Sequence, residues 1–167
     1  MKSMIILPLL FLIYAETACA AGEMAFRGTL LDSVPCEINN AEALSVDFGD
    51  VGVNKIDGER YLQALSFPLH CPGGPFEEPF RLMYYGQASD FDPAALKTST
   101  EGLGIKLKAQ CNGQDFCEVK IGGGIGISMS GNEALQMNFQ VVPVKKQGAM
   151  LEAGEFNANA SFRLEYY

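Results

Sequence analysis

The stretch that decides the fold stands at the end of the chain, where residues 154–167 read GEFNANASFRLEYY. From Phe156 to Tyr166 its apolar and small residues fall on every second position. This is the period of a β-strand with one buried face. Taken alone, the alternation fits an ordinary core strand with an aromatic end equally well. The rest of the chain has to decide what this strand faces.

A second alternating stretch stands near the start, where residues 22–31 read GEMAFRGTLL. Its small and apolar positions are Gly22, Met24, Phe26, Gly28 and Leu30. No turn follows that would lead this strand into a hairpin, so it cannot satisfy its own backbone groups locally. The sequence therefore predicts a strand whose partner lies elsewhere.

The first twenty residues have the pattern of a secretory signal peptide. Lys2 supplies the positive charge, the run MIILPLLFLIY is apolar, and small residues precede the expected cleavage point after Ala20. The apolar run is too short to span a membrane, and no later run is longer, so we expect no membrane insertion. Lipidation at Cys19 is disfavoured because Glu16 occupies a position that requires an aliphatic residue. We expect residues 1–20 to be removed on export.

The mature chain of about 147 residues is enough for one domain with a real core. The formal net charge of -8 disfavours a nucleic-acid partner, which would need a basic face. No repeat and no linker divides the chain. These features predict a single exported domain.

Most of this domain has the period of strands. Alternation is clear in LSFPLHC, PFRLMYY, LGIKLKAQ and LQMNFQV, which are residues 65–71, 79–85, 103–110 and 135–141. Clusters of Gly, Pro, Asn and Asp separate these runs and predict turns. Only residues 92–100 indicate a short helical turn, with Asp92 as its cap. Several short alternating strands favour an all-β sandwich.

Four cysteines remain after export, and an even number in an exported chain indicates disulfides. A Cys36–Cys71 bridge would join the ends of two strands, with a loop entropy worth about 3–4 kcal/mol. A Cys111–Cys117 bridge would close a hairpin loop. A metal site is the alternative, but the chain has no Cys-x-x-Cys pair and only one histidine, His70. We expect neither a metal nor a cofactor.

Catalytic chemistry is hard to find in this sequence. His70 stands in a strand beside a cysteine, where a packing role is more common than that of a general base. Glu77 and Glu78 are adjacent and point to opposite faces of a strand. The glycine-rich residues 120–131 have neither the Gly-Lys-Ser/Thr ending of a phosphate loop nor a following helix. We therefore expect no enzyme.

The two ends together resemble a known family, the pilin subunits of chaperone–usher fimbriae. Residues 24–38, MAFRGTLLDSVPCEI, resemble the donor extension and first strand of these pilins. VDFGDVGV (46–53) and SFPLHCP (66–72) resemble the next strands with the second disulfide cysteine. At the other end, Gly154 is fourteenth from the end and Tyr166 is penultimate, as in the family's subunit ending. The likeness is greatest to the minor tip-fibrillum and adaptor subunits of P-type pili.

The resemblance implies an incomplete immunoglobulin-like β-sandwich that lacks its last strand. It also implies three segments: a signal peptide (1–20), an N-terminal donor-strand extension (21–31) and the pilin domain (32–167). Met24, Phe26, Gly28 and Leu30 would be the donor residues, inserted into the groove of a neighbouring subunit by strand addition. Glycine at position 28 would permit close approach. The strand without a local partner would then find it on another chain.

The acceptor groove would lie along the C-terminal strand. Its implied residues, which a chaperone would also bind, are Gly154, Phe162, Leu164, Tyr166 and Tyr167. The implied partners are a periplasmic pilus chaperone, an outer-membrane usher and neighbouring pilins. The implied location is the cell-surface fimbrium, reached through the periplasm. Two features depart from the family: the extension is short, and the Cys111–Cys117 pair is not part of the common pattern.

Three functions remain open from the sequence. The first is a structural minor pilin, at the tip or as an adaptor, that contributes to cell adhesion. The second is a single-domain secreted module that binds carbohydrate or a receptor through a mobile loop at 86–102. The third, a secreted enzyme, is disfavoured because no catalytic constellation is evident.

Overall fold

The computed structural model describes residues 27–28, 36–72, 80–129 and 134–166. The chain divides into two units, residues 1–32 and 33–167. In the first unit only Arg27 and Gly28 are described, and both are exposed and belong to no strand. The other three predicted donor residues, Met24, Phe26 and Leu30, lie outside the described residues.

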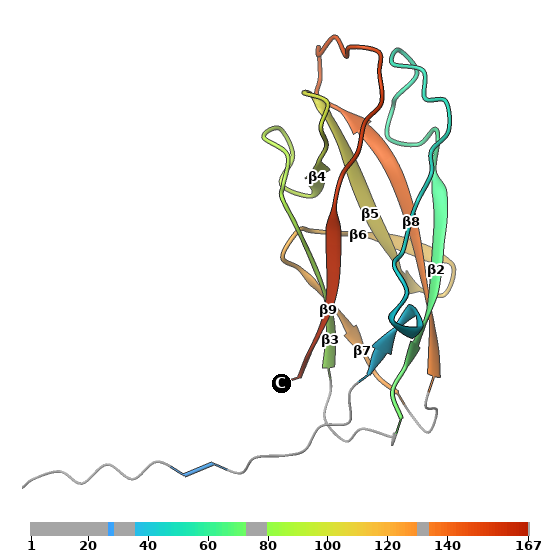
Figure 1. Cartoon of the computed structure of the whole chain (residues 1–167), viewed down its shortest axis with the longest axis vertical. Coiled ribbons are helices and arrows are strands. Elements are labelled where there is room, and N and C mark those ends of the chain that lie inside the picture. The colour runs from blue at the N-terminus through green and yellow to red at the C-terminus, as the bar shows by residue number, and fades with distance from the viewer. Residues whose placement is uncertain (1–26, 29–35, 73–79, 130–133, 167) are drawn as a thin grey trace, which may run out of the picture. The chain divides into compact units, whose positions relative to one another are not determined.

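The second unit is a sandwich of two antiparallel sheets, which confirms the all-β prediction (Figure 1). In the larger sheet the strand order is β1-β2-β8-β5-β4, and β6 also pairs with β5. Its strands are β1 (Glu37–Ile38), β2 (Gln63–His70), β4 (Ala95–Lys97), β5 (Leu103–Asn112), β6 (Asp115–Val119) and β8 (Ala134–Lys145). The smaller sheet has the order β7-β3-β9, from β3 (Phe80–Gly86), β7 (Gly124–Ile127) and β9 (Ala160–Tyr166). A short 3-10 turn, η1 (Asn39–Ala41), follows β1.

The core lies between the sheets and is built from the alternating positions that the sequence predicts. In the larger sheet Phe67 and Phe139 are fully buried, and their rings stack with centroids 5.3 Å apart. In the smaller sheet Leu82 and Tyr84 are buried from the other side. Burying a large apolar side chain contributes roughly 1.5–3 kcal/mol. The interior of the sandwich therefore fixes the register of its central strands.

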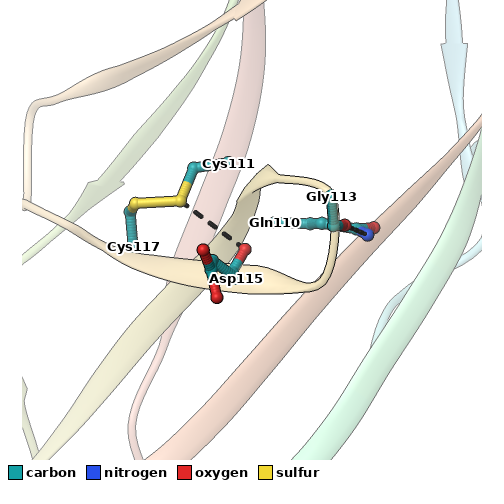
Figure 2. The surroundings of a disulfide bond; sticks show 5 residues. All are labelled: Gln110, Cys111, Gly113, Asp115 and Cys117. Atoms are coloured by element: carbon teal, nitrogen blue, oxygen red, sulfur yellow. Dashed lines mark hydrogen bonds between the residues drawn. A yellow bond between two sulfur atoms is a disulfide. The ribbon is translucent and has the colours of Figure 1, made fainter.

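Both predicted disulfides are present. Cys36 bonds Cys71, which ties the start of β1 to the end of β2, where Glu37 faces His70 across the sheet. Cys111 bonds Cys117 across the β5–β6 hairpin, as Figure 2 shows. In the same turn the side-chain amide of Gln110 donates a hydrogen bond to the carbonyl oxygen of Gly113. The second disulfide thus cross-links the two strands of a surface hairpin.

The segment from 86 to 102 differs from its prediction. Asp92 does cap a turn, because its Oδ1 accepts a hydrogen bond of 2.9 Å from the N–H of Ala94. The chain then enters strand β4 instead of a helix, since Ala95 pairs with Lys106 of β5. Ser89 also donates its N–H to the carbonyl of Ala95. A neighbouring strand outweighs the local preference, so Ala95–Lys97 form a strand where the sequence indicates a helical turn.

Candidate functional site

An apolar cleft of about 1340 Å³ lies along one side of the sandwich. One wall is formed by residues 41–53, drawn in cyan in Figure 1, and the other by residues 151–160, which lead into β9. Between the walls the floor consists of apolar side chains from both sheets: Leu65, Tyr84, Leu96, Leu103, Ile105, Leu107 and Val141. The cleft therefore exposes part of the core between two chain segments.

The first wall has the pattern of a strand without being one. Leu44, Val46 and Phe48 are half-buried and pack against the core, whereas Ser45 and Asp47 between them are exposed. No backbone group of residues 43–48 forms a hydrogen bond with the described part of the chain. The strand expected at 46–53 therefore does not form, because no described segment beside it offers backbone partners.

The second wall also alternates like a strand without forming one over most of its length. The alternation predicts a strand from Phe156, but β9 begins only at Ala160, where it pairs with Gly86. Among the described residues, 150–156 have no backbone hydrogen bond, and Asn157 is held by the N–H of Ser99 at 2.9 Å. Among the described strands β9 is at the edge of its sheet, and no described strand pairs with its side away from β3.

Phe162 joins the cleft to the core. It lines the cleft from β9, and its ring lies 5.2 Å from Phe139, 5.4 Å from Phe67 and 5.5 Å from Tyr84 between centroids. Burial raises the pKa of Tyr84 to about 12, since an ionised phenolate would lose its hydration there. Through Phe162 and Tyr84, which both line the cleft, this aromatic cluster connects the cleft to the buried core.

An aromatic side chain from each wall makes contact across the cleft at one point along its length. The ring centroids of Phe48 and Phe156, one from each wall, are 6.0 Å apart. Aromatic pairs at this separation attract each other beyond the area that they bury. The two rings therefore bring the walls together across the cleft at this point.

The predicted groove residues are placed as follows. Gly154 and Phe162 line the cleft. Leu164 instead packs against the core, opposite Leu82 in the sheet. For Tyr166 the structure describes the backbone, which pairs with Phe80, and Tyr167 lies outside the described residues.

The sequence did not identify the first wall as part of a groove. Its signal was present in the alternation of Leu44, Val46 and Phe48, but the alternation says only which side faces the core. The segment on the opposite side of the cleft also lacks a partner, because of the order of strands in the sheet. No local sequence pattern predicts that order. A groove between the two walls is visible only in three dimensions.

Away from the cleft, the described titratable residues form one compact ionic cluster. No group of three or more His, Cys, Asp or Glu among them could hold a metal ion. The main ionic cluster is on the larger sheet, where Lys106 Nζ lies 2.8 Å from Asp92 and 2.6 Å from Glu118. Hydrogen bonds to these two carboxylates raise the pKa of Lys106, and the bond to Lys106 lowers that of Asp92. No helix in the described part of the chain is long and apolar enough to cross a membrane.

Comparison with known proteins agrees with this architecture. A family model described as "Fimbrial protein" matches residues 24–167. The fimbrial-like protein YfcQ of Escherichia coli K12, itself described as uncharacterized, is 28% identical over 96% of both chains. YfcR of the same strain, also uncharacterized, is 30% identical over 79% of this chain and 73% of its own length.

Among solved structures, the P pilus adaptor subunit PapF is similar with a TM-score of 0.60 and 22% identity, over 80% of this chain and 96% of its own. This likeness concerns the fold, which is the immunoglobulin-like sandwich of pilins. Because the family match extends over most of the sequence, the chain belongs to the fimbrial protein family and is a pilin of the chaperone–usher type.

Proposed function

We propose that this chain is a structural minor pilin, a tip or adaptor subunit, whose cleft is completed by the N-terminal strand of a neighbouring subunit. The observation that carries the proposal is the apolar cleft between two walls in which residues 43–48 and 150–156 have no backbone hydrogen-bond partner in the described part of the chain. An exposed apolar surface of this kind marks an interaction site.

The backbone of the walls suits an added strand. An incoming strand could form hydrogen bonds with residues 43–48 on one side and with residues 150–156 on the other. Strand addition of this kind gains affinity from main-chain hydrogen bonds and specificity from pockets for alternate side chains. Both walls would then become regular strands, which explains why each already has the alternation of one.

The proposed donor is the segment 21–31 of another subunit. Met24, Phe26, Gly28 and Leu30 would face the apolar floor, two residues apart, as the pleat of a strand requires. Gly28 would pass above the rings of Phe48 and Phe156, where one ring from each wall lies close to the other and a residue without a side chain leaves room for both. In the described structure Gly28 is exposed, and a Cβ atom placed on it would meet nothing within 4 Å. The glycine is therefore not required by its own surroundings in this chain.

The remaining parts of the proposal follow from the family. A signal peptide, residues 1–20, would direct export, and the pilin domain would begin at residue 32. Before assembly a periplasmic chaperone would cover the cleft and bind the C-terminal end at Tyr166 and Tyr167, and an outer-membrane usher would exchange it for the donor strand. The subunit would contribute to adhesion as part of the surface fimbrium.

The test compares two arginine substitutions in the donor segment. Phe26→Arg places a charge at an inward position, and Thr29→Arg places the same charge at an outward position. Each variant is expressed with the other fimbrial components, and subunit ladders are separated on gels without boiling. We expect Phe26→Arg to abolish the ladder while the chaperone complex persists, and Thr29→Arg to leave both intact. Loss of the chaperone complex in the Phe26 variant would show that this segment belongs to the subunit's own fold.

A further inference from the structure

The rim of the cleft is acidic. Among its lining residues are five carboxylates and no lysine or arginine; the five are Glu42, Asp47, Asp50, Glu152 and Glu155. All five are exposed. Within the described part of the chain, the ion pairs of the structure involve none of them. An occupant of the cleft would therefore meet carboxylates on both walls that form no ion pair with the described residues.

We propose that this rim selects a donor strand with a basic residue on its outward face, and that the occupant is the N-terminal segment of a second copy of this chain, with Arg27 as the selected residue. The inference rests on the proposed function, since it concerns which strand the cleft accepts. It goes further by naming the charge, at Arg27, that distinguishes the strand that the cleft accepts.

Arg27 is at the position that the rim requires. If Phe26 and Gly28 face the floor, the alternation of a strand turns Arg27 toward solvent between them. Arg27 is exposed in the structure, and no ion pair with the described residues involves it. The segment thus brings an available positive charge to the cleft.

The geometry of the walls places carboxylates beside that charge. The rings of Phe48 and Phe156 meet across the cleft, and their preceding neighbours Asp47 and Glu155 are exposed on the rim. With Gly28 above the two rings, its neighbour Arg27 lies at nearly the same level. The guanidinium would then have a carboxylate on each wall within reach of its long side chain.

The expected effect is moderate and depends on salt. A pair of exposed opposite charges changes an equilibrium by about twofold to fivefold. Replacing Arg27 by glutamate removes two such attractions and adds repulsion, so we expect binding to weaken about tenfold at low salt. Added salt screens exposed charges and reduces the difference. Charge complementarity of this kind also raises the association rate.

The experiment uses labelled peptides of residues 21–31 and the full mature chain as acceptor, carrying Phe26→Arg so that its own segment does not compete. Fluorescence anisotropy gives the Kd of the natural peptide and of its Arg27→Lys and Arg27→Glu forms at low and high salt. We expect similar Kd values for arginine and lysine, a Kd about tenfold higher for glutamate at low salt, and a smaller difference at high salt. A second acceptor with Asp47→Asn and Glu155→Gln should lose most of this preference.

Three results would overturn the inference in distinguishable ways. Equal Kd values for the arginine and glutamate peptides would refute the charge selection and leave strand addition standing. Binding of the donor segment of a different subunit, with no binding of this one, would refute the second copy as occupant. If no peptide binds to an acceptor that circular dichroism shows to be folded, the proposed function fails with it.

Discussion

Replacing Phe162 by alanine should weaken the pilin domain and its cleft together. Phe162 is half-buried, and its ring contacts three others, those of Phe67, Tyr84 and Phe139. Removing a fully buried phenylalanine costs about 3–5 kcal/mol. Because part of this side chain faces the open cleft, we expect the free energy of unfolding to fall by about 2 kcal/mol.

Urea denaturation followed by circular dichroism measures this change. The mature chain with Phe26→Arg serves as the reference, so that assembly does not contribute to its stability. Ser161→Ala is the matched control, because Ser161 is the preceding residue of β9 and is exposed, and we expect a change within about 0.5 kcal/mol. Equal unfolding free energies for the two variants would refute the claim that the aromatic cluster supports the cleft.

Three further predictions concern the same domain. Replacing both cysteines of the Cys36–Cys71 bridge by serine should lower the free energy of unfolding by about 4 kcal/mol, and the same change at Cys111–Cys117 should lower it by about 2 kcal/mol. The difference arises because the two bridges close loops of 35 and 6 residues. Urea midpoints in the reverse order would contradict this prediction. The pKa of Tyr84 is raised from 10.0 to about 12, so its neutral form stabilises the folded state fully below pH 10 and this contribution is lost as pH rises toward 12. Tyr84→Phe should flatten that alkaline loss, and an unchanged pH profile would show that another group causes it. Tyr166→Asp should remove the subunit from the periplasm because an unpaired charge would oppose chaperone binding, and normal levels with chaperone still bound would count against this role.

The sequence predicted the central strands well because each carries its own signal. In β8, residues Met137, Phe139 and Val141 are buried at the alternate positions that the pattern assigns to the core. Its partner β2 has the same alternation, and both runs are long enough to pair over eight residues. Where alternation and pairing coincide, local sequence is sufficient.

The walls of the cleft show where local sequence is insufficient. Residues 43–48 and 155–159 alternate like strands but are not strands, because alternation reports the buried face and not the presence of a partner. The three-residue strand β4 shows the opposite case. Its residues have no clear alternation, yet they form a strand because they pair with β5. The Lys106 cluster was also missed, because it joins residues from three separate segments.

The most direct test of the central claim is a disulfide formed between two chains. One chain carries a cysteine at Met24, Phe26 or Leu30, and the other carries Ala158→Cys, a half-buried position in the cleft wall. The control partner carries Ala64→Cys, an exposed position of β2 away from the cleft lining. The account predicts that at least one donor cysteine forms a heterodimer with the Ala158 variant, seen on non-reducing gels and by mass spectrometry, and none with the Ala64 variant. Cross-linking to both partners alike, or only within a single chain bearing both cysteines, would contradict strand exchange between subunits.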